Sequence, residues 1–184
     1  MKRRTSAYPS WPERQAIWSA RDRSAALLLH RAAAREWLVR FFGVVSRLGD
    51  GWTWTVLIAV LPWLGGAQGA SASVRMIGVF LVNIAIYLIV KRCIARPRPF
   101  RSSTDFRECT RSLDEHSFPS GHTLHAVAFS LVLSVYYPWA AFVLWPFTLL
   151  VALSRVVLGL HYPSDVIVGA LIGGIVAAVG FNVI

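Results

Sequence analysis

Long apolar runs separated by short turns constrain the fold of this chain most strongly. A helix needs about 20 mainly apolar residues to cross a bilayer, and within lipid only helices and closed barrels satisfy their own backbone polar groups. Hydrophobic residues make up 55% of the chain, which is too apolar for an ordinary soluble domain. We therefore predict an all-α polytopic membrane helix bundle of about five spans. The runs cover residues 51–66, 74–90, 120–137, 140–158 and 165–184.

Small residues mark the expected turn between the first two runs, from Gly65 to Ser73. The first run is short for a membrane span and contains Pro62, so it either begins before Gly51 or thins the bilayer locally. The last run is rich in Gly and Ala. Small side chains let neighbouring helices approach closely, which favours tight packing of this run.

The first 50 residues are basic and differ in character from the rest. Arginines alternate with Trp, Leu and Phe, and no uncharged stretch is long enough to span a membrane. The pattern favours one or two amphipathic helices lying in the membrane interface. The alternatives are a basic tail at residues 1–12 and a sixth span at residues 24–46. We predict a basic interfacial segment at residues 1–50 and a transmembrane domain at residues 51–184.

Five spans joined by tight turns place several polar residues on one membrane face. Lys91 lies at the end of the second run and His122 at the start of the third. Arg155 lies at the end of the fourth run and Asp165 at the start of the fifth. Because alternate turns lie on the same side of a membrane, these four residues are expected to converge.

The distribution of positive charge predicts which face this is. The chain has 19 Lys and Arg against 9 Asp and Glu, a net charge of +10. Only Arg75 falls on the opposite face, and 15 cations share the first face when Lys91, Arg98 and Arg155 are set aside. Short loops rich in Lys and Arg stay cytoplasmic, so we predict an inner-membrane protein whose polar clusters face the cytoplasm. Such a surface favours anionic lipid headgroups over nucleic acid as its partner.

The segment Phe118–His122 stands where a polar loop meets the third run. Pro119 is tolerated near a helix start, Ser120 is a good helix cap, and Gly121 permits close approach of the backbone. The N-terminus of a helix carries free N–H groups and the positive end of the helix dipole, so it attracts anions. His122 exchanges protons near neutral pH. The segment predicts one wall of a phosphate pocket.

Two further clusters supply cations to this pocket. Lys91, Arg98 and Arg155 each stand beside a helix end that is expected to face Ser120. A phosphoryl group needs several fixed donors, which Arg offers as a planar fork and Lys as a point charge. The other cations of this face are expected to be solvated or to extend toward the membrane surface. They are Arg92, Arg96, Arg101, Arg107 and Arg111.

His161 and Asp165 stand four residues apart, so both can lie on one face of a helix that begins near Tyr162. A carboxylate against one imidazole nitrogen fixes the tautomer and leaves the other nitrogen free to attack. A buried His–Asp pair by itself would equally fit a structural role. The three cations and His122 on the same face favour catalysis instead.

For other polar residues near these clusters, the sequence leaves two alternatives. His125, one turn beyond His122, and Ser154 either support the pocket or pack behind it. The residues Asp114, Glu115 and His116 either tune substrate access or belong to a solvated loop. Neither a carboxylate cluster nor a paired Cys/His spacing predicts a metal site, so we expect none. The two cysteines, Cys93 and Cys109, are expected to be structural.

The three clusters resemble the signature of the type 2 phosphatidic acid phosphatase (PAP2) superfamily. The resemblance covers roughly residues 51–184, and every position of the pattern is matched. The three motifs are Lys91-x6-Arg98-Pro99, Pro119-Ser120-Gly121-His122 and Ser154-Arg155-x5-His161-x3-Asp165.

This resemblance implies a role for each motif residue. His161 is the expected nucleophile, which forms a phosphohistidine, and Asp165 orients it. His122 is the expected general acid, and then the base that activates water. The family needs no metal or cofactor. The residues expected to hold the phosphoryl oxygens are Lys91, Arg98, Ser120, Gly121 and Arg155.

The sequence thus favours a metal-independent membrane phosphatase acting on a lipid phosphate monoester or pyrophosphate. Candidate substrates are phosphatidylglycerophosphate, phosphatidate and polyprenyl-linked phosphates, and the oligomeric state stays open. Undecaprenyl pyrophosphate in carrier-lipid recycling is the alternative within this class. A non-catalytic protein that binds anionic lipid, or a small transporter, is the alternative from another class. Such a protein needs the cations, but not a nucleophile with an oriented acidic partner.

Overall fold

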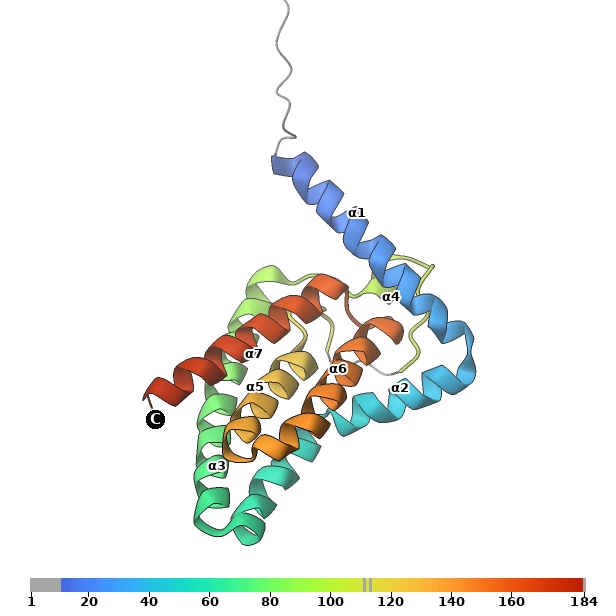
Figure 1. Cartoon of the computed structure of the whole chain (residues 1–184). Coiled ribbons are helices and arrows are strands. Elements are labelled where there is room, and N and C mark those ends of the chain that lie inside the picture. Colours follow the sequence, from blue (N-terminus) through green and yellow to red (C-terminus); the bar gives the residue numbers. More distant parts are fainter. Residues whose placement is uncertain (1–10, 111, 113, 184) are drawn as a thin grey trace, which may run out of the picture.

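A computed structural model describes residues 11–110, 112 and 114–183, and this part of the chain is almost wholly helical (Figure 1). The helices follow from the apolar runs and from the turn residues between them. In chain order, the elements are α1 (Trp11–His30), η1 (Arg31–Ala34), α2 (Glu36–Leu48), α3 (Gly51–Ile94), α4 (Pro99–Ser102), α5 (Gly121–Tyr136), η2 (Pro138–Ala140), α6 (Ala141–Val157) and α7 (Pro163–Val183).

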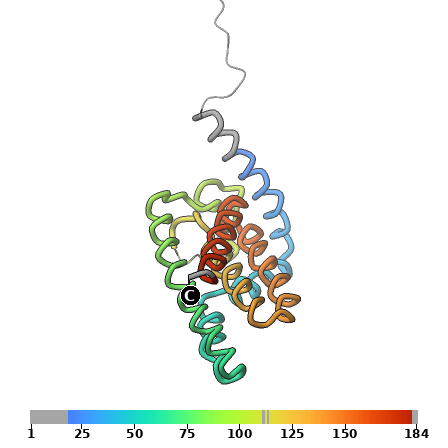
Figure 2. Tube along the Cα trace, turned by 60° about the vertical axis from the view of Figure 1, so that its left-hand side comes forward, coloured from blue at the N-terminus to red at the C-terminus, as the bar shows by residue number. Residues whose placement is uncertain are grey.

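The apolar helices form the predicted polytopic membrane bundle. In the part of the chain that the structure describes, three helical stretches are long and apolar enough to cross a membrane, namely Gly51–Ile94, Pro138–Val157 and Pro163–Phe181, and α5 is a shorter apolar helix. The stretch α3 consists of two limbs, because Gly66 takes a left-handed φ of 54° between them. The limbs double back at the end of the bundle farthest from α1 (Figures 1 and 2). Counted as limbs, the apolar segments match the five predicted runs.

The turn inside α3 is shorter than predicted. Helix resumes directly after Gly66, whereas the sequence suggested a turn from Gly65 to Ser73. The small residues of this stretch serve packing instead: a Cβ on Gly69 would lie 2.0 Å from the carbonyl oxygen of Leu61. The Ser73 hydroxyl donates a hydrogen bond to the carbonyl oxygen of Ile58 at 2.8 Å. One residue with positive φ is enough to reverse the chain, and small side chains let the two limbs touch.

Helix α5 is packed against α3, α6 and α7 and carries much of the buried core. The rings of Trp54 and Phe129 are in contact in this core, with centroids 5.2 Å apart and planes tilted by 52°. The contact between α5 and α7 is especially close. A Cβ on Gly169 would lie 2.5 Å from the carbonyl oxygen of Ser120, and one on Gly173 would lie 2.1 Å from that of Leu124. The Gly-rich face of α7 thus allows α5 to approach at backbone distance.

The N-terminal helices pack beside the bundle. Helix α2 is amphipathic, as predicted: Val45 and Ser46 are buried, whereas Trp37 and Phe41 are exposed. Helix α1 lacks this periodicity and docks through its second half, where Ala26 is fully buried against Phe106, Val156 and Tyr162. Most of the basic tail considered at residues 1–12 lies outside the described residues.

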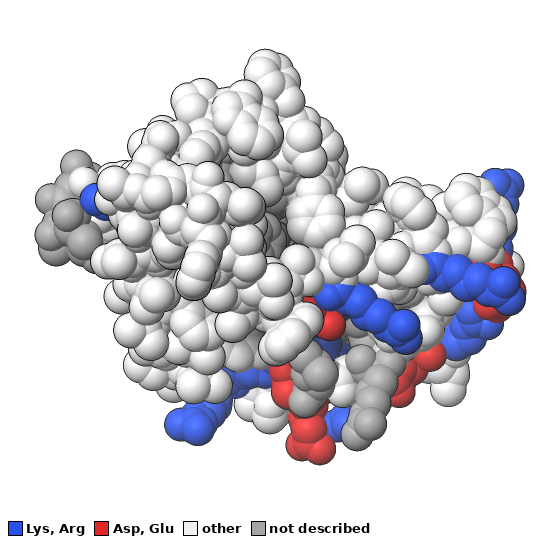
Figure 3. All heavy atoms as spheres, turned by 90° about the horizontal axis from the view of Figure 1, so that it is seen from below, with Lys and Arg blue, Asp and Glu red and all other residues white. Residues whose placement is uncertain are grey.

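Charged side chains are unevenly distributed over the surface. Figure 3 shows them gathered along one side of a face that is otherwise uncharged. Arg75 stands apart from this group, at the other end of the bundle. Its guanidinium donates to the carbonyl oxygen of Gly180 at 2.7 Å and to the Tyr136 hydroxyl at 3.1 Å, and it lies over the Phe181 ring. This arrangement satisfies an isolated cation beside apolar helices.

The close contact between α5 and α7 predicts opposite effects at two adjacent glycines. Gly173→Ala places a methyl group against the backbone of Leu124 and is expected to lower the free energy of unfolding by about 1–3 kcal/mol. Gly174→Ala meets only ordinary contacts at 3.9 Å and is expected to be neutral or slightly stabilising. Thermal unfolding in detergent measures both. Equal midpoints for the two variants would contradict this account of the packing.

Candidate active site

The three predicted phosphate-binding cations are buried at one end of the bundle. Lys91 in α3, Arg98 before α4 and Arg155 in α6 are 7%, 2% and 4% exposed. Cations at a membrane surface ordinarily keep their charged groups in water, so this degree of burial needs partners within the protein. Lys91 and Arg98 share one carboxylate, and Arg98 and Arg155 both act electrostatically on His161.

Neutral groups hold each cation in place. Lys91 donates to the hydroxyl of Tyr87, one turn earlier on α3. The Nη1 of Arg98 donates to the carbonyl oxygen of Leu160 at 2.9 Å, and the Nη1 of Arg155 donates to the Ser46 hydroxyl at 2.5 Å. Neither Tyr87 nor Ser46 was predicted from the sequence. The i, i+4 spacing of Tyr87 and Lys91 was an available signal, whereas Ser46 lies 109 positions from Arg155 and gave none.

Asp114 is the shared carboxylate. Its Oδ2 lies 2.6 Å from the Nζ of Lys91, and its Oδ1 lies 2.8 Å from the Nη2 of Arg98. Burial by itself would raise the pKa of Asp114, but the contacts with Lys91 and Arg98 outweigh it and lower the pKa to about 2. Of the two alternatives given for Asp114, the solvated loop is therefore wrong. In this structure an ionised carboxylate contacts two of the three cations that are predicted to bind phosphate.

His161 lies between α6 and α7 and is 2% exposed. Its Nε2 is 3.2 Å from the Nη1 of Arg98. Because a guanidinium only donates, Nε2 accepts, and the proton of the neutral ring is on Nδ1. Burial, followed by the charges of Arg155 and Arg98, lowers the pKa of His161 well below its usual value. The ring is therefore neutral, with the lone pair of Nε2 directed at a phosphate-binding cation.

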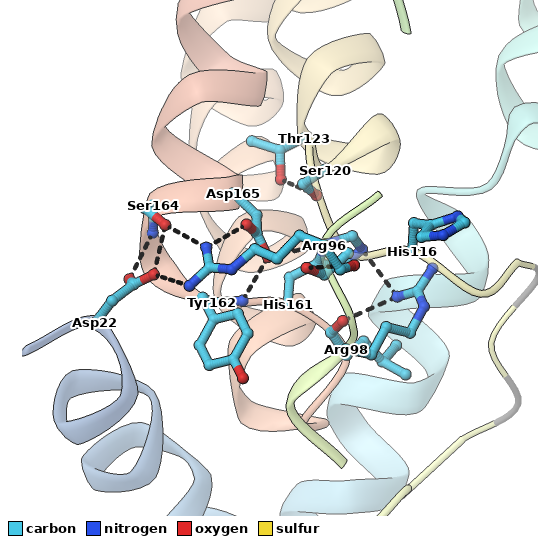
Figure 4. A network of polar contacts seen from close by, with 12 residues as sticks. Asp22, Arg96, Arg98, His116, Ser120, Thr123, His161, Tyr162, Ser164 and Asp165 are labelled. Atoms are coloured by element: carbon cyan, nitrogen blue, oxygen red, sulfur yellow. Dashed lines mark hydrogen bonds and ion pairs between the residues drawn. The ribbon is translucent and has the colours of Figure 1, made fainter. Parts of the chain in front are cut away.

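Asp165 is less directly engaged with His161 than the spacing predicted. The distance from the His161 Nδ1 to the Asp165 Oδ2 is 3.7 Å, which is too long for a hydrogen bond. The same Oδ2 accepts the backbone N–H of Tyr162 at 2.8 Å, and Oδ1 accepts from the Nη1 of Arg96 at 2.7 Å (Figure 4). The first turn of α7 and Arg96 thus hold the carboxylate beside the ring at ion-pair distance.

Arg96, which is not a defining residue of the three motifs, also contacts this carboxylate. It also pairs with Asp22 of α1 at 2.7 Å, and its guanidinium lies over the ring of Tyr162 (Figure 4). Asp22 additionally accepts the backbone N–H of Ser164 at 3.0 Å. The expectation of a solvated Arg96 is therefore wrong, since carboxylates on both sides compensate its charge.

Three of the remaining cations of this face are exposed, as expected, namely Arg92, Arg101 and Arg107. Arg101 lies 3.4 Å from Glu115 and Arg107 lies 3.0 Å from Glu36. Arg111 lies outside the described residues.

The segment before α5 joins the motifs through its backbone. The N–H of Ser120 donates to the carbonyl oxygen of Asp165 at 3.0 Å, so this amide is already bonded. The Ser120 hydroxyl pairs with that of Thr123 at 3.0 Å and makes no capping bond to the helix. A Cβ on Gly121 would lie 2.9 Å from the Tyr87 ring, which explains the glycine. The Nε2 of His122 lies 2.5 Å from the Oδ1 of Asp50. Asp50 was not predicted from the sequence.

Two further predicted residues lie behind this site. The His125 ring stacks on Phe129, with centroids 5.6 Å apart, and lies tilted against Phe80, with centroids 5.2 Å apart. The Ser154 hydroxyl donates a hydrogen bond to the carbonyl oxygen of Val151 within α6 at 2.6 Å. The contacts of His125 are packing contacts, and that of Ser154 is a local hydrogen bond. Within the described part of the chain, no group of three His, Cys, Asp or Glu residues could hold a metal ion.

The shared carboxylate predicts how Asp114→Asn will respond to anions. Without phosphate, the variant leaves Lys91 and Arg98 less compensated. Its free energy of unfolding is expected to be about 1–3 kcal/mol lower. The loss is moderate because Asp114 is only partly buried. Added inorganic phosphate should raise its thermal midpoint more than that of the unmodified protein, since no carboxylate competes for the cations. Glu115→Gln, at an exposed neighbour, is the control. An identical phosphate response in both variants would contradict the assignment.

The chain matches known proteins in sequence and in fold. A decaprenylphosphoryl-5-phosphoribose phosphatase of Mycobacterium tuberculosis is 36% identical over 104 residues, which are 55% of this chain and 55% of the relative, so the chain spans about half the length of that curated relative. The structure of Aquifex aeolicus LpxE superposes with a TM-score of 0.75 and 26% identity, covering 85% of this chain and 92% of that one. A PAP2-type phosphatidylglycerolphosphate phosphatase from Bacillus subtilis superposes with a TM-score of 0.69 and 24% identity, over 86% and 84%.

The family model that matches the chain is that of the PAP2 superfamily, over residues 72–184. This range includes every candidate site residue that was predicted from the motifs. Because the match extends over more than half of the chain, and because the fold agrees with solved membrane members, this protein belongs to the PAP2 superfamily.

Proposed function

We propose that this protein is an integral membrane phosphatase that hydrolyses a lipid phosphate monoester or pyrophosphate through a phosphohistidine. The observation that carries the proposal is the neutral His161, whose unprotonated Nε2 lies 3.2 Å from Arg98 beside buried cations. A nucleophile next to donors that hold a phosphoryl group is the arrangement that phosphoryl transfer requires.

The reaction has two steps. In the first, the Nε2 of His161 attacks phosphorus, and the bond from phosphorus to the leaving oxygen breaks while His122 gives that oxygen a proton. In the second, His122 takes a proton from water, the water oxygen bonds to phosphorus, and the P–N bond breaks to release inorganic phosphate. Lys91, Arg98 and Arg155 stabilise the charge on the non-bridging oxygens in both steps. Asp165 stabilises the charge that develops on the His161 ring.

An apolar groove beside the site supports a lipid substrate. It has a volume of about 560 Å³ and runs between the two limbs of α3 and the side of α5, with walls that include Ile58, Phe80 and Phe129. The lining also includes Gly51, which directly follows Asp50 in the chain, and His125, which lies one helical turn beyond His122. A tail in this groove would remain within the bilayer while its phosphate reaches the cations.

The side on which the site opens narrows the substrate class. We place it at the cytoplasmic face of the inner membrane, because Lys and Arg are concentrated in the loops on the side of the site. Substrates made on that leaflet include phosphatidylglycerophosphate and polyprenyl-linked sugar phosphates. The relative from M. tuberculosis is named for a substrate of the second kind. Undecaprenyl pyrophosphate recycling takes place mainly in the outer leaflet. A cytoplasmic site therefore makes it the alternative and not the first choice.

His161→Asn tests the catalytic proposal against the alternative of a non-catalytic lipid-binding protein. The variant is expected to lose release of inorganic phosphate from a panel of lipid phosphates in detergent, because Asn supplies no nucleophilic nitrogen. Its free energy of unfolding should stay within about 1 kcal/mol of that of the unmodified protein. Activity of the unmodified protein should persist in EDTA, and orthovanadate should inhibit it. Full activity of the variant would reject the nucleophile, and a strict metal requirement would reject the mechanism.

A reporter fused after Ile184 tests the orientation. With five spans and a cytoplasmic site, the C-terminus lies on the other side of the membrane. Paired fusions of alkaline phosphatase and a cytoplasm-dependent fluorescent protein should therefore show activity of the first and no signal from the second. The reverse result would show that the number of spans or the orientation is wrong.

A further inference from the structure

The carboxylate of Asp50 meets the imidazole of His122 across 72 positions of sequence. The distance from the His122 Nε2 to the Asp50 Oδ1 is 2.5 Å. The His122 side chain is 13% exposed and that of Asp50 is 38% exposed. Asp50 belongs to none of the three sequence motifs, and the two steps proposed above make no use of it. The motifs and the proposed steps therefore do not explain why Asp50 contacts His122.

The local backbone presents Asp50 to His122 rather than to its own helix. Asp50 directly precedes α3, where an Asp side chain ordinarily caps free N–H groups, but it makes no capping bond here. Its extended conformation (φ −67°, ψ 155°) and the bond from the Trp54 indole to the carbonyl oxygen of Gly49 hold the turn. The backbone N–H of Asp50 donates to the carbonyl oxygen of Arg47 at 3.1 Å. The carboxylate is thus held in place by the α2–α3 turn.

Asp50 stands in a predominantly positive environment. The hydrogen bond with His122 lowers the pKa of Asp50, burial opposes this, and the charges of His122, Arg155 and Arg47 lower it further. The charges of Arg155 and Arg98 also act on His122, and His125 lies one turn along the same helix. The charge of a protonated His122 acts in turn on His161. The imidazolium that His122 forms when it gains a proton therefore lies among cations, and the carboxylate in contact with the ring is that of Asp50.

We propose that Asp50 is a positioning residue for His122, and the proposal rests on the phosphatase function proposed above. Asp50 accepts the Nε2–H, which fixes the ring and leaves Nδ1 to exchange the proton. In the first step, Nδ1 gives its proton to the leaving oxygen as the P–O bond breaks. In the second, Nδ1 takes a proton from water as the P–N bond breaks. Asp50 stays ionised throughout and stabilises the imidazolium. The site then contains two His–carboxylate pairs, one for each histidine.

Asp50→Asn keeps the shape of the side chain and removes its charge. We expect kcat to fall about 10- to 100-fold, as when the partner of a functional histidine is lost, with little change in KM. The alkaline limb of the pH profile should move to lower pH, because the imidazolium has lost its counter-charge. Asp50→Glu should recover part of the activity. Asp105→Asn is the control, since Asp105 is an exposed carboxylate paired with Arg23, and it should leave activity and pH profile unchanged.

The leaving group distinguishes this role from a purely structural one. p-Nitrophenyl phosphate releases a weakly basic phenolate that needs little protonation. The rate of phosphoenzyme formation, measured as the burst of nitrophenolate, should therefore fall less in Asp50→Asn than the corresponding rate with an alkyl phosphate. In a His122→Asn background, Asp50→Asn should cause no further loss, because the residue acts through His122.

Each outcome decides for or against the proposal. Higher activity in Asp50→Asn would show that the carboxylate blocks the site and would overturn it. Equal losses with both leaving groups, or additive losses in the double variant, would also overturn it. If the unmodified protein releases no phosphate from any substrate, the proposed function fails. If it is active, and His122→Asn is impaired while Asp50→Asn is normal, only the role of Asp50 fails.

Discussion

Three cations buried at one end of an apolar helix bundle are the constraint on which the rest of the structure depends. Removing a cation from water costs several kcal/mol unless charges and dipoles compensate it. Asp114 compensates Lys91 and Arg98, while Tyr87, Leu160 and Ser46 supply neutral acceptors. A phosphoryl group could take over the role of Asp114, because it offers more oxygens to the same donors. The cations that need compensation for the fold to be stable are thus the same groups that we propose hold the phosphoryl oxygens.

The first 50 residues contribute more to the site than their composition suggested. Asp22 pairs with Arg96, Ser46 accepts from Arg155, and Asp50 meets His122. Each contact supports a residue of the pocket or one that holds a motif residue. The N-terminal helices, expected mainly to lie in the membrane interface, therefore also form a second layer of polar partners around the pocket. This layer fixes the groups that would have to keep their geometry during the proposed phosphoryl transfer.

The sequence predicted the helical membrane bundle and the residues of the three motifs, because apolar length and motif spacing are local properties. It did not predict that Arg96 is paired or that Asp114 binds two cations. In each case, the partner lies on another element, and a charged residue in a polar loop resembles a solvated one until that partner is known. The i, i+4 spacing of His161 and Asp165 correctly placed them near each other, but at 3.7 Å rather than at hydrogen-bond distance. The helix start and Arg96 compete for the same carboxylate.

Three features of the sequence were enough to assign the class of the protein: five apolar segments, a strongly one-sided distribution of positive charge, and three motifs in the order of a PAP2 protein. Which charges compensate one another depends on how the helices pack. Gly169 and Gly173 let α5 and α7 meet at backbone distance, and the Ser120 amide then bonds to the Asp165 carbonyl. This contact joins the motif of His122 to that of His161. Hydropathy acts along the chain and can be read from it, whereas the pairing of buried charges depends on distances of a few ångströms between segments that only packing brings together.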